Sequence, residues 1–258
     1  MINFAQLQML SLEQSDSVAE ARLKLDRIAE HFLQLPKQPL YVEAFAKIRK
    51  DFPVQALIAA DAFAVPHDYT PGLLPEELQH DSLGFVRGAH LIYAGRFVYP
   101  VKDPKGHVAG WCGYDPFETP KYLDSINYGY SAKNSLFYGS EKLHEYYRSG
   151  KPVIVVEGIV CCLWLRNNGF QALSSLGSYL TPYMVTVLKR FGRNCIVISD
   201  SDEAGTKYRE QVRKQLPLAK CVQSCIAKDV DDSRIKFPNL AEEINKLLHP
   251  FGSSSYFR

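Results

Sequence analysis

The chain has 258 residues, of which 46% are hydrophobic and 22% charged, a composition typical of a globular protein that buries one large core or two smaller ones. Its formal net charge of +2 excludes the strongly basic signature of a histone-like binder, so any contact with nucleic acid has to come from a local surface. No apolar run approaches the roughly 20 residues that span a bilayer, and the N-terminus lacks the charged and apolar regions of a secretory signal. We therefore expect a cytoplasmic protein without membrane contacts.

The N-terminal third of the chain favours helices. Apolar residues recur at steps of three and four between residues 4 and 35, and shorter helical patterns cover residues 42–49 and 54–60. A proline-punctuated loop follows from Pro66 to Pro75. We predict a small helical N-terminal region, residues 1–83, that serves packing and interaction.

Strand patterns begin at about residue 84. His90–Gly106 predicts a β-hairpin with its turn at Asp103–Gly106, and His107–Tyr114 predicts the next strand. A polar loop and a short helix, Glu141–Arg148, follow. Residues 84–150 are therefore expected to form a basic, mixed α/β subdomain.

Strands and helices alternate regularly in the last part of the chain, residues 151–258. Such alternation predicts an α/β fold in which helices flank a parallel sheet. The predicted strands end at Glu157, Leu176, Ser199 and Ala227, and the predicted helices are Ile159–Asn167, Pro182–Phe191, Thr206–Leu216 and Leu240–Leu248.

Carboxylates follow two of these predicted strands. Glu157 ends the apolar run from Pro152, and Asp200 and Asp202 follow Cys195–Ser199. Parallel strands deliver such side chains to their carboxyl ends, where open α/β sheets place their sites. Oxygen ligands of this kind suit a hard divalent cation, above all Mg²⁺. The alternative for both aspartates is a strand-end turn or a helix cap.

Six cysteines raise the question of a zinc site. Cys221 and Cys225 form a C-x₃-C pattern, but no second Cys or His pair lies nearby to complete four ligands. We expect reduced, mostly buried thiols and no zinc.

The acidic residues lie in motifs that resemble the Toprim domain, an α/β metal-binding fold shared by DnaG-type primases, topoisomerases and some nucleases. Val156–Gly158 resembles its glutamate-glycine motif, and Asp200–Gly205 resembles its Asp-x-Asp-x-Ala-Gly motif. Ala172–Gly177 is similar to the turn between them, and Lys228–Asp231 to the late Lys-Asp-Pro-Asp element.

Upstream motifs narrow the resemblance to DnaG-type primases. Arg96–Gly113 is similar to the primase segment R-x-x-F-P-I-x-D-x-x-G-x-V-x-G-F-G-G, and Pro120–Ser125 to P-K-Y-L-N-S. The resemblance covers residues 84–248. It departs from the family where Cys161 replaces an aspartate and Tyr114 replaces a basic residue. Neither the zinc module nor a Walker motif is found, which suggests a phage or mobile-element version of the catalytic core.

This resemblance implies a DNA primase, a nucleotidyltransferase that acts as a DNA-directed RNA polymerase and makes short RNA primers on single-stranded DNA from ribonucleoside triphosphates. Mg²⁺ or Mn²⁺ would be its cofactor. The implied catalytic and metal-binding residues are Glu157, Asp200 and Asp202, and Asp229 and Asp231 would complete the metal site.

The same resemblance implies nucleic-acid or nucleotide contacts upstream. Arg96, Lys121 and Lys133 are the candidate phosphate ligands. Aromatic residues of the strand region offer stacking surfaces for bases, although core packing is the better interpretation for Trp111. The candidates for stacking are Tyr99, Tyr114 and Tyr122.

Two other functions remain open. A Toprim nuclease would use the same acidic residues for hydrolysis, although the basic residues between Arg96 and Lys133 disfavour it. A non-catalytic replication accessory protein would keep the fold and bind partners, and Cys161 and Tyr114 mildly favour it. For a primase, we expect a replicative helicase or a zinc-domain protein as a partner supplied by another chain.

Overall fold

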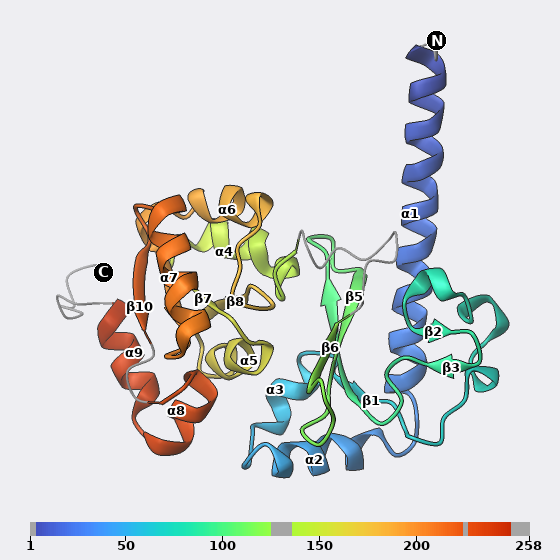
Figure 1. Ribbon diagram of the computed structural model, residues 1–258, viewed down its shortest axis with the longest axis horizontal. Helices are drawn as coiled ribbons and strands as arrows, with labels where there is room; N and C mark the ends of the chain where they lie inside the picture. The colour runs from blue at the N-terminus through green and yellow to red at the C-terminus, as the bar shows by residue number, and fades with distance from the viewer. Residues whose placement is uncertain (1–3, 125–135, 224–226, 249–258) are drawn as a thin grey trace. The chain divides into compact units, whose positions relative to one another are not determined.

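The computed structural model describes residues 4–124, 136–223 and 227–248, and side chains of the first helix from Ser17 onward (Figure 1). The chain divides into two compact units, residues 1–136 and 137–258. The three-part division expected from the sequence stays a prediction. In the described ranges, no helix combines the length and the hydrophobicity needed to cross a bilayer.

Over its described residues, the first unit combines three α-helices and three short 3-10 helices with two antiparallel sheets. Its larger sheet has the strand order β1-β4-β5-β6, and β2 pairs with β3 separately. The helices are α1 (Phe4–Leu33), α2 (Gln38–Ile48) and α3 (Val54–Ile58); the strands are β1 (Phe63–Ala64), β2 (Val86–Arg87), β3 (His90–Leu91), β4 (Phe97–Lys102), β5 (Val108–Tyr114) and β6 (Tyr122–Asp124).

The predicted hairpin turn at Asp103–Gly106 is confirmed. The Asp103 carboxylate accepts from the Lys105 amide at 2.8 Å, and Gly106 takes φ 93°, which a residue with a side chain rarely adopts. The hairpin is shorter than predicted, because His90–Leu91 pairs with Val86–Arg87 rather than joining β4.

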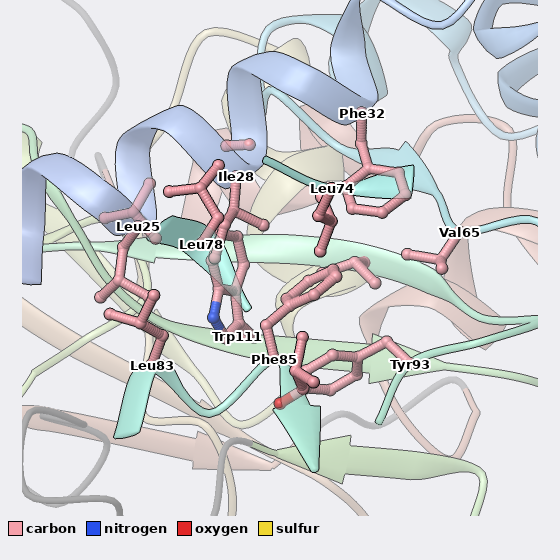
Figure 2. Close-up of a cluster of buried hydrophobic side chains, with 14 of the residues drawn as sticks. Leu25, Ile28, Phe32, Val65, Leu74, Leu78, Leu83, Phe85, Tyr93 and Trp111 are labelled. Atoms are coloured by element: carbon pink, nitrogen blue, oxygen red, sulfur yellow. The ribbon is translucent and has the colours of Figure 1, made fainter. Parts of the chain in front are cut away.

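A core of aromatic and aliphatic side chains joins α1 to the strands of this unit. Figure 2 shows Leu25, Ile28 and Phe32 of α1 facing the side chains of Phe85 and Trp111. Trp111 is 1% exposed, which confirms its predicted place in the core.

Polar contacts fasten the same helix to β5. The Asp26 carboxylate accepts from the Val108 amide and from His107 Nδ1, both at 2.7 Å. The N-terminal helix and the strands therefore form one structural unit.

The second unit contains the predicted parallel sheet flanked by helices. Its strand order is β10-β9-β7-β8, and every neighbouring pair is parallel. The strands are β7 (Val153–Val156), β8 (Gln171–Ser174), β9 (Cys195–Ser199) and β10 (Lys220–Gln223); the helices are α4 (Leu143–Ser149), α5 (Ile159–Asn167), α6 (Pro182–Lys189), α7 (Glu203–Gln215), α8 (Val230–Lys236) and α9 (Leu240–Leu248).

Two of the differences from the predicted helices have a clear physical cause. Asp202 caps α7, so this helix begins at Glu203 rather than at Thr206. Asp229 caps α8 in the same way, where the sequence predicted no helix.

The core of the first unit gives a stability prediction. Phe32 is fully buried and stacks on Phe63 with ring centroids 5.3 Å apart. Phe32→Ala should lower the free energy of unfolding by about 3–5 kcal/mol, because it leaves a cavity in a close-packed core. Urea denaturation measures this loss. Leu33→Ala is the matched control, since Leu33 is 37% exposed, and an equal loss in both variants would contradict this account of the core.

Candidate functional site

Two neighbouring strands of the second unit bring the acidic motifs together. β7 and β9 pair in register from Val153 opposite Cys195 to Val155 opposite Val197. Glu157 directly follows β7, and Asp200 directly follows β9. The sequence prediction that both carboxylates lie at the carboxyl edge of the sheet is therefore confirmed.

Glu157 is held on three sides. Its carboxylate Oε1 accepts from the Asp200 amide at 2.9 Å, which links the two strand ends. Its backbone carbonyl accepts from Ser174 Oγ at 2.7 Å and from the Gly177 amide at 3.1 Å. The Ala172–Gly177 turn, which had no predicted role, thus fixes the position of Glu157.

Asp200 carries the strongest electrostatic signal of the site. The pKa of its carboxyl is raised to about 7, first by burial and then by the negative charges of Glu157, Asp229 and Asp202, while Lys228 lowers it. The three other carboxylates therefore act on that of Asp200. A divalent cation at this place would relieve their repulsion.

Asp202 has a structural as well as an electrostatic role. Its Oδ1 accepts from the Gly205 amide at 2.9 Å, so the cap proposed as an alternative is present. Its Oδ2 lies 3.6 Å from Lys228 Nζ. β9 ends at Ser199, so Asp200 and Asp202 lie in the following turn and not on one face of the strand.

The two late aspartates differ in their surroundings. Asp229 caps α8 by accepting from the Asp232 amide at 2.8 Å, and its charge acts on Asp200. Asp231 is 5% exposed, and its Oδ1 lies 2.6 Å from Arg234 Nε. Of the two, Asp229 is the better placed to join Glu157 and Asp200.

Cys161 lies close to the acidic cluster. Burial raises the pKa of its thiol well above the ordinary value, and the charges of Asp229, Asp231 and Asp200 act in the same direction. This is the position where the sequence resemblance expects an aspartate. Because the thiol stays protonated and neutral, it adds no further negative charge to the acidic cluster.

A buried arginine on α7 supports the turn that carries Asp200. Arg209 is 9% exposed and donates to Ser199 Oγ at 2.8 Å, to the Asp200 carbonyl at 3.3 Å and to Thr206 Oγ1 at 3.0 Å. This residue was not among those predicted from the sequence. The sequence did offer one signal: Arg209 lies seven residues, or two helical turns, after Asp202. Residues at this spacing lie on the same face of a helix, which here is the face toward the sheet.

Gly205 allows the helix to approach this turn closely. A Cβ placed on Gly205 would lie 2.2 Å from the Asp200 carbonyl oxygen, which is a backbone atom that no rotamer change can move. The glycine of the acidic motif is therefore required by close backbone contact.

These carboxylates suit Mg²⁺ or Mn²⁺ bound partly by water and substrate better than a metal ion held by protein ligands alone. Among the residues that the structure describes, no three His, Cys, Asp or Glu side chains converge tightly enough to hold an ion by themselves. Mg²⁺ commonly uses one or two carboxylates and completes its shell with water and substrate phosphates. Glu157 and Asp200, with Asp202 and Asp229 close by, supply such carboxylates.

The candidate phosphate ligands of the first unit lie in different environments. Arg96 is 8% exposed, and its Nη1 donates to the carbonyls of Pro120 and Lys121, both at 3.1 Å. Lys121 itself is exposed. Arg96 thus braces the segment that presents Lys121, while Lys133 lies outside the described residues.

The candidate stacking residues are mostly buried. Tyr99 and Tyr114 are 0% and 5% exposed, whereas Tyr122 is 42% exposed and packs against Tyr114 with ring centroids 4.8 Å apart. Tyr122 is the tyrosine of this set whose side chain is exposed enough for a base to stack on it.

Comparison with known proteins shows what part of the chain resembles. Residues 154–234 match the family model described as Toprim-like. The second unit contains a Toprim-like domain. Over 118 residues the chain is 33% identical to the DNA primase of Deinococcus radiodurans, an alignment that covers 45% of this chain and 21% of that protein. It is thus a homologue of bacterial DNA primases, and it spans about a fifth of the length of this relative.

Solved structures share the fold over most of the chain. The RNA polymerase domain of Mycobacterium tuberculosis primase DnaG matches with a TM-score of 0.73 and 16% identity, over 90% of this chain and 83% of that one. A DnaG primase catalytic domain bound to single-stranded DNA matches with a TM-score of 0.70 and 21% identity, over 88% and 78% of the two chains. The Toprim fold predicted from the sequence is confirmed.

Gly205→Ala should destabilise the second unit. We expect it to lower the free energy of unfolding by about 1–3 kcal/mol, because the added methyl group overlaps the backbone of Asp200. Thermal denaturation followed by circular dichroism measures the effect. Gly72→Ala is the matched control, since no atom lies within 4 Å of its added Cβ. A stable Gly205→Ala variant would contradict the close contact.

The raised pKa of Asp200 predicts a pH dependence of stability. Asp200 binds its proton more tightly in the folded protein, at a pKa of about 7, than in the unfolded chain, at a pKa of about 4. Its stabilising contribution is complete below the lower value and is lost as the pH rises through 7. Without divalent cations, Asp200→Asn should therefore exceed the wild type in stability at pH 8 by about 1–2 kcal/mol after allowance for solvent screening, and match it near pH 4.

Urea denaturation at both pH values, with and without Mg²⁺, measures this difference. Mg²⁺ should stabilise the wild type at pH 8 more than Asp200→Asn, because the variant has less repulsion to relieve. Glu210→Gln, at an exposed position on the same helix α7, should behave as the wild type. A pH-independent difference between wild type and Asp200→Asn would disprove the electrostatic account.

Proposed function

We propose that this chain is the catalytic core of a DNA primase, which makes short RNA primers on single-stranded DNA by metal-dependent nucleotidyl transfer. The observation that carries this proposal is the meeting of Glu157 with Asp200 and Asp202 at neighbouring strand ends of a Toprim-like domain. Homology to bacterial DNA primases supports it, as does the similar fold of a primase domain bound to single-stranded DNA.

In this function, Glu157, Asp200 and Asp202 would hold Mg²⁺ or Mn²⁺, with Asp229 beside them. The ion neutralises charge on the triphosphate and aligns the attacking 3′-hydroxyl when bound. The protein side chains supply the negative site and fix its position, through the amide of Asp200 on Glu157 and through Arg209 behind the turn. Asp231, paired with Arg234, would act by supporting α8.

Phosphate contacts would come from the first unit. Lys121 is exposed, and Arg96 holds the backbone of its segment, so Lys121 is our first candidate ligand of template or ribonucleoside triphosphate and Arg96 its support. Lys133 is a further candidate from the sequence. We place this function in the cytoplasm, of the host if the chain is phage-encoded, with a replicative helicase or a zinc-domain protein as partner.

Primer synthesis tests the proposal directly. Wild-type protein, single-stranded DNA and labelled ribonucleotides should give short RNA products in Mg²⁺ or Mn²⁺, with a replicative helicase added in a parallel reaction. Asp200→Asn and Glu157→Gln should lower the rate of primer synthesis at least about 100-fold. Each removes a negative carboxylate that would hold the divalent ion, and the ion would stabilise the charge of the transition state. Glu210→Gln is the control and should retain full activity.

The outcome also separates the competing functions. Cleavage of DNA or RNA by the wild type, with no primer made, would establish a Toprim nuclease with the same acidic residues. Absence of both activities, with partners present, would favour the non-catalytic accessory protein.

A further inference from the structure

The opposite end of the same parallel sheet is strongly basic. In α/β units the strands begin where the flanking helices end, so the cations that precede strands and those in the last turns of helices share one edge. Here this edge carries eight exposed cations, which we call the basic edge: Arg148, Lys151, Lys189, Arg190, Arg193, Arg213, Lys214 and Lys220.

Specific contacts hold these segments side by side. Lys151 and Arg193 each stand two residues before strands that pair in register, and Asn194 Nδ2 donates to the Gly150 carbonyl at 3.0 Å between them. Tyr147 donates to the Val187 carbonyl at 2.8 Å and stacks on Phe191, with ring centroids 4.3 Å apart. The last turns of α4 and α6 are thereby joined into one surface.

The third part of the basic edge belongs to α7 and β10. Arg213 and Lys214 lie in the last turn of α7, and Lys220 begins β10, which pairs with β9. α7 packs in the same hydrophobic cluster as α4 and α6. Figure 1 shows α6 and α8 at opposite ends of this unit, so the basic edge lies away from the carboxylates that α8 adjoins.

The described residues show no ion pair for these cations, although Glu145, Glu210 and Glu242 lie near some of them. Among the described residues, none of the eight takes part in an ion pair, and the parts of the second unit outside the described ranges contain no Asp or Glu. The second unit as a whole carries 17 Lys and Arg against 12 Asp and Glu, while the first carries 13 against 16. Favourable helix dipoles account for single cations at helix ends but not for a group of eight that also includes residues before strands.

We propose that the basic edge binds the phosphate backbone of nucleic acid, independently of the acidic end. Phosphate contacts need exposed Lys and Arg rather than a cavity, and they carry no sequence preference. An interface for an acidic protein would be expected to include an apolar centre, whereas Leu218 is the large apolar residue exposed within these edge segments. This surface goes beyond primer synthesis, because binding there requires neither metal nor catalysis.

Fluorescence anisotropy with a labelled oligothymidylate, in EDTA and over a range of salt concentrations, tests this inference on the full chain. Arg190→Gln/Arg193→Gln should weaken binding at least about tenfold. The slope of log K against log salt should fall by about 1.4, since each phosphate that is no longer neutralised accounts for about 0.7. Arg213→Gln/Lys214→Gln, on another helix, should do the same.

Matched variants keep the inference falsifiable. Lys47→Gln/Lys105→Gln removes two exposed cations of the first unit and should leave the affinity unchanged. The binding is measured in EDTA and without nucleotides, so a failure of the primase proposal would not affect this result. Equal weakening in the control pair, an unchanged salt slope in the edge variants, or equally tight binding of polyglutamate would each overturn the proposal.

Discussion

Glu157 and Asp200 concentrate negative charge at two adjacent strand ends, and the surrounding fold has to oppose the repulsion between them. Backbone amides do most of this. The Asp200 amide donates to Glu157, the Gly205 amide to Asp202 and the Asp232 amide to Asp229. Since each amide belongs to a strand end or a helix start, the site exists only when the sheet and its helices are assembled.

The same requirement explains the neutral residues around the site. Ser174 and Gly177 hold the carbonyl of Glu157, and Gly205 gives α7 room to approach Asp200. Arg209 contributes a buried positive charge behind the turn, on hydroxyl and carbonyl acceptors. These residues touch no reacting group in the proposed function, yet they determine where the carboxylates lie.

Local pattern was sufficient to predict the parallel sheet, because β7 and β9 are short apolar runs that end at carboxylates and because strands and helices alternate along this unit. It also located Glu157 and Asp200, since a strand end fixes where its next residue lies. It did not show the pairing of Asp231 with Arg234, because this contact forms only once α8 exists. Arg96 gave the same difficulty: its sequence context looks like a surface cation, and only the folded chain brings the carbonyls of Pro120 and Lys121 to it.

The distribution of charge along the sheet has a consequence for how the second unit meets other molecules. Carboxylates gather at one end of the strands and a group of exposed cations at the other, so positive and negative charges of this unit are separated along the strands. In the field of a polyanion such a body is rotated before contact, with its positive pole leading. The first encounter with any polyanion is therefore oriented, and this orienting torque fades as added salt shortens the Debye length.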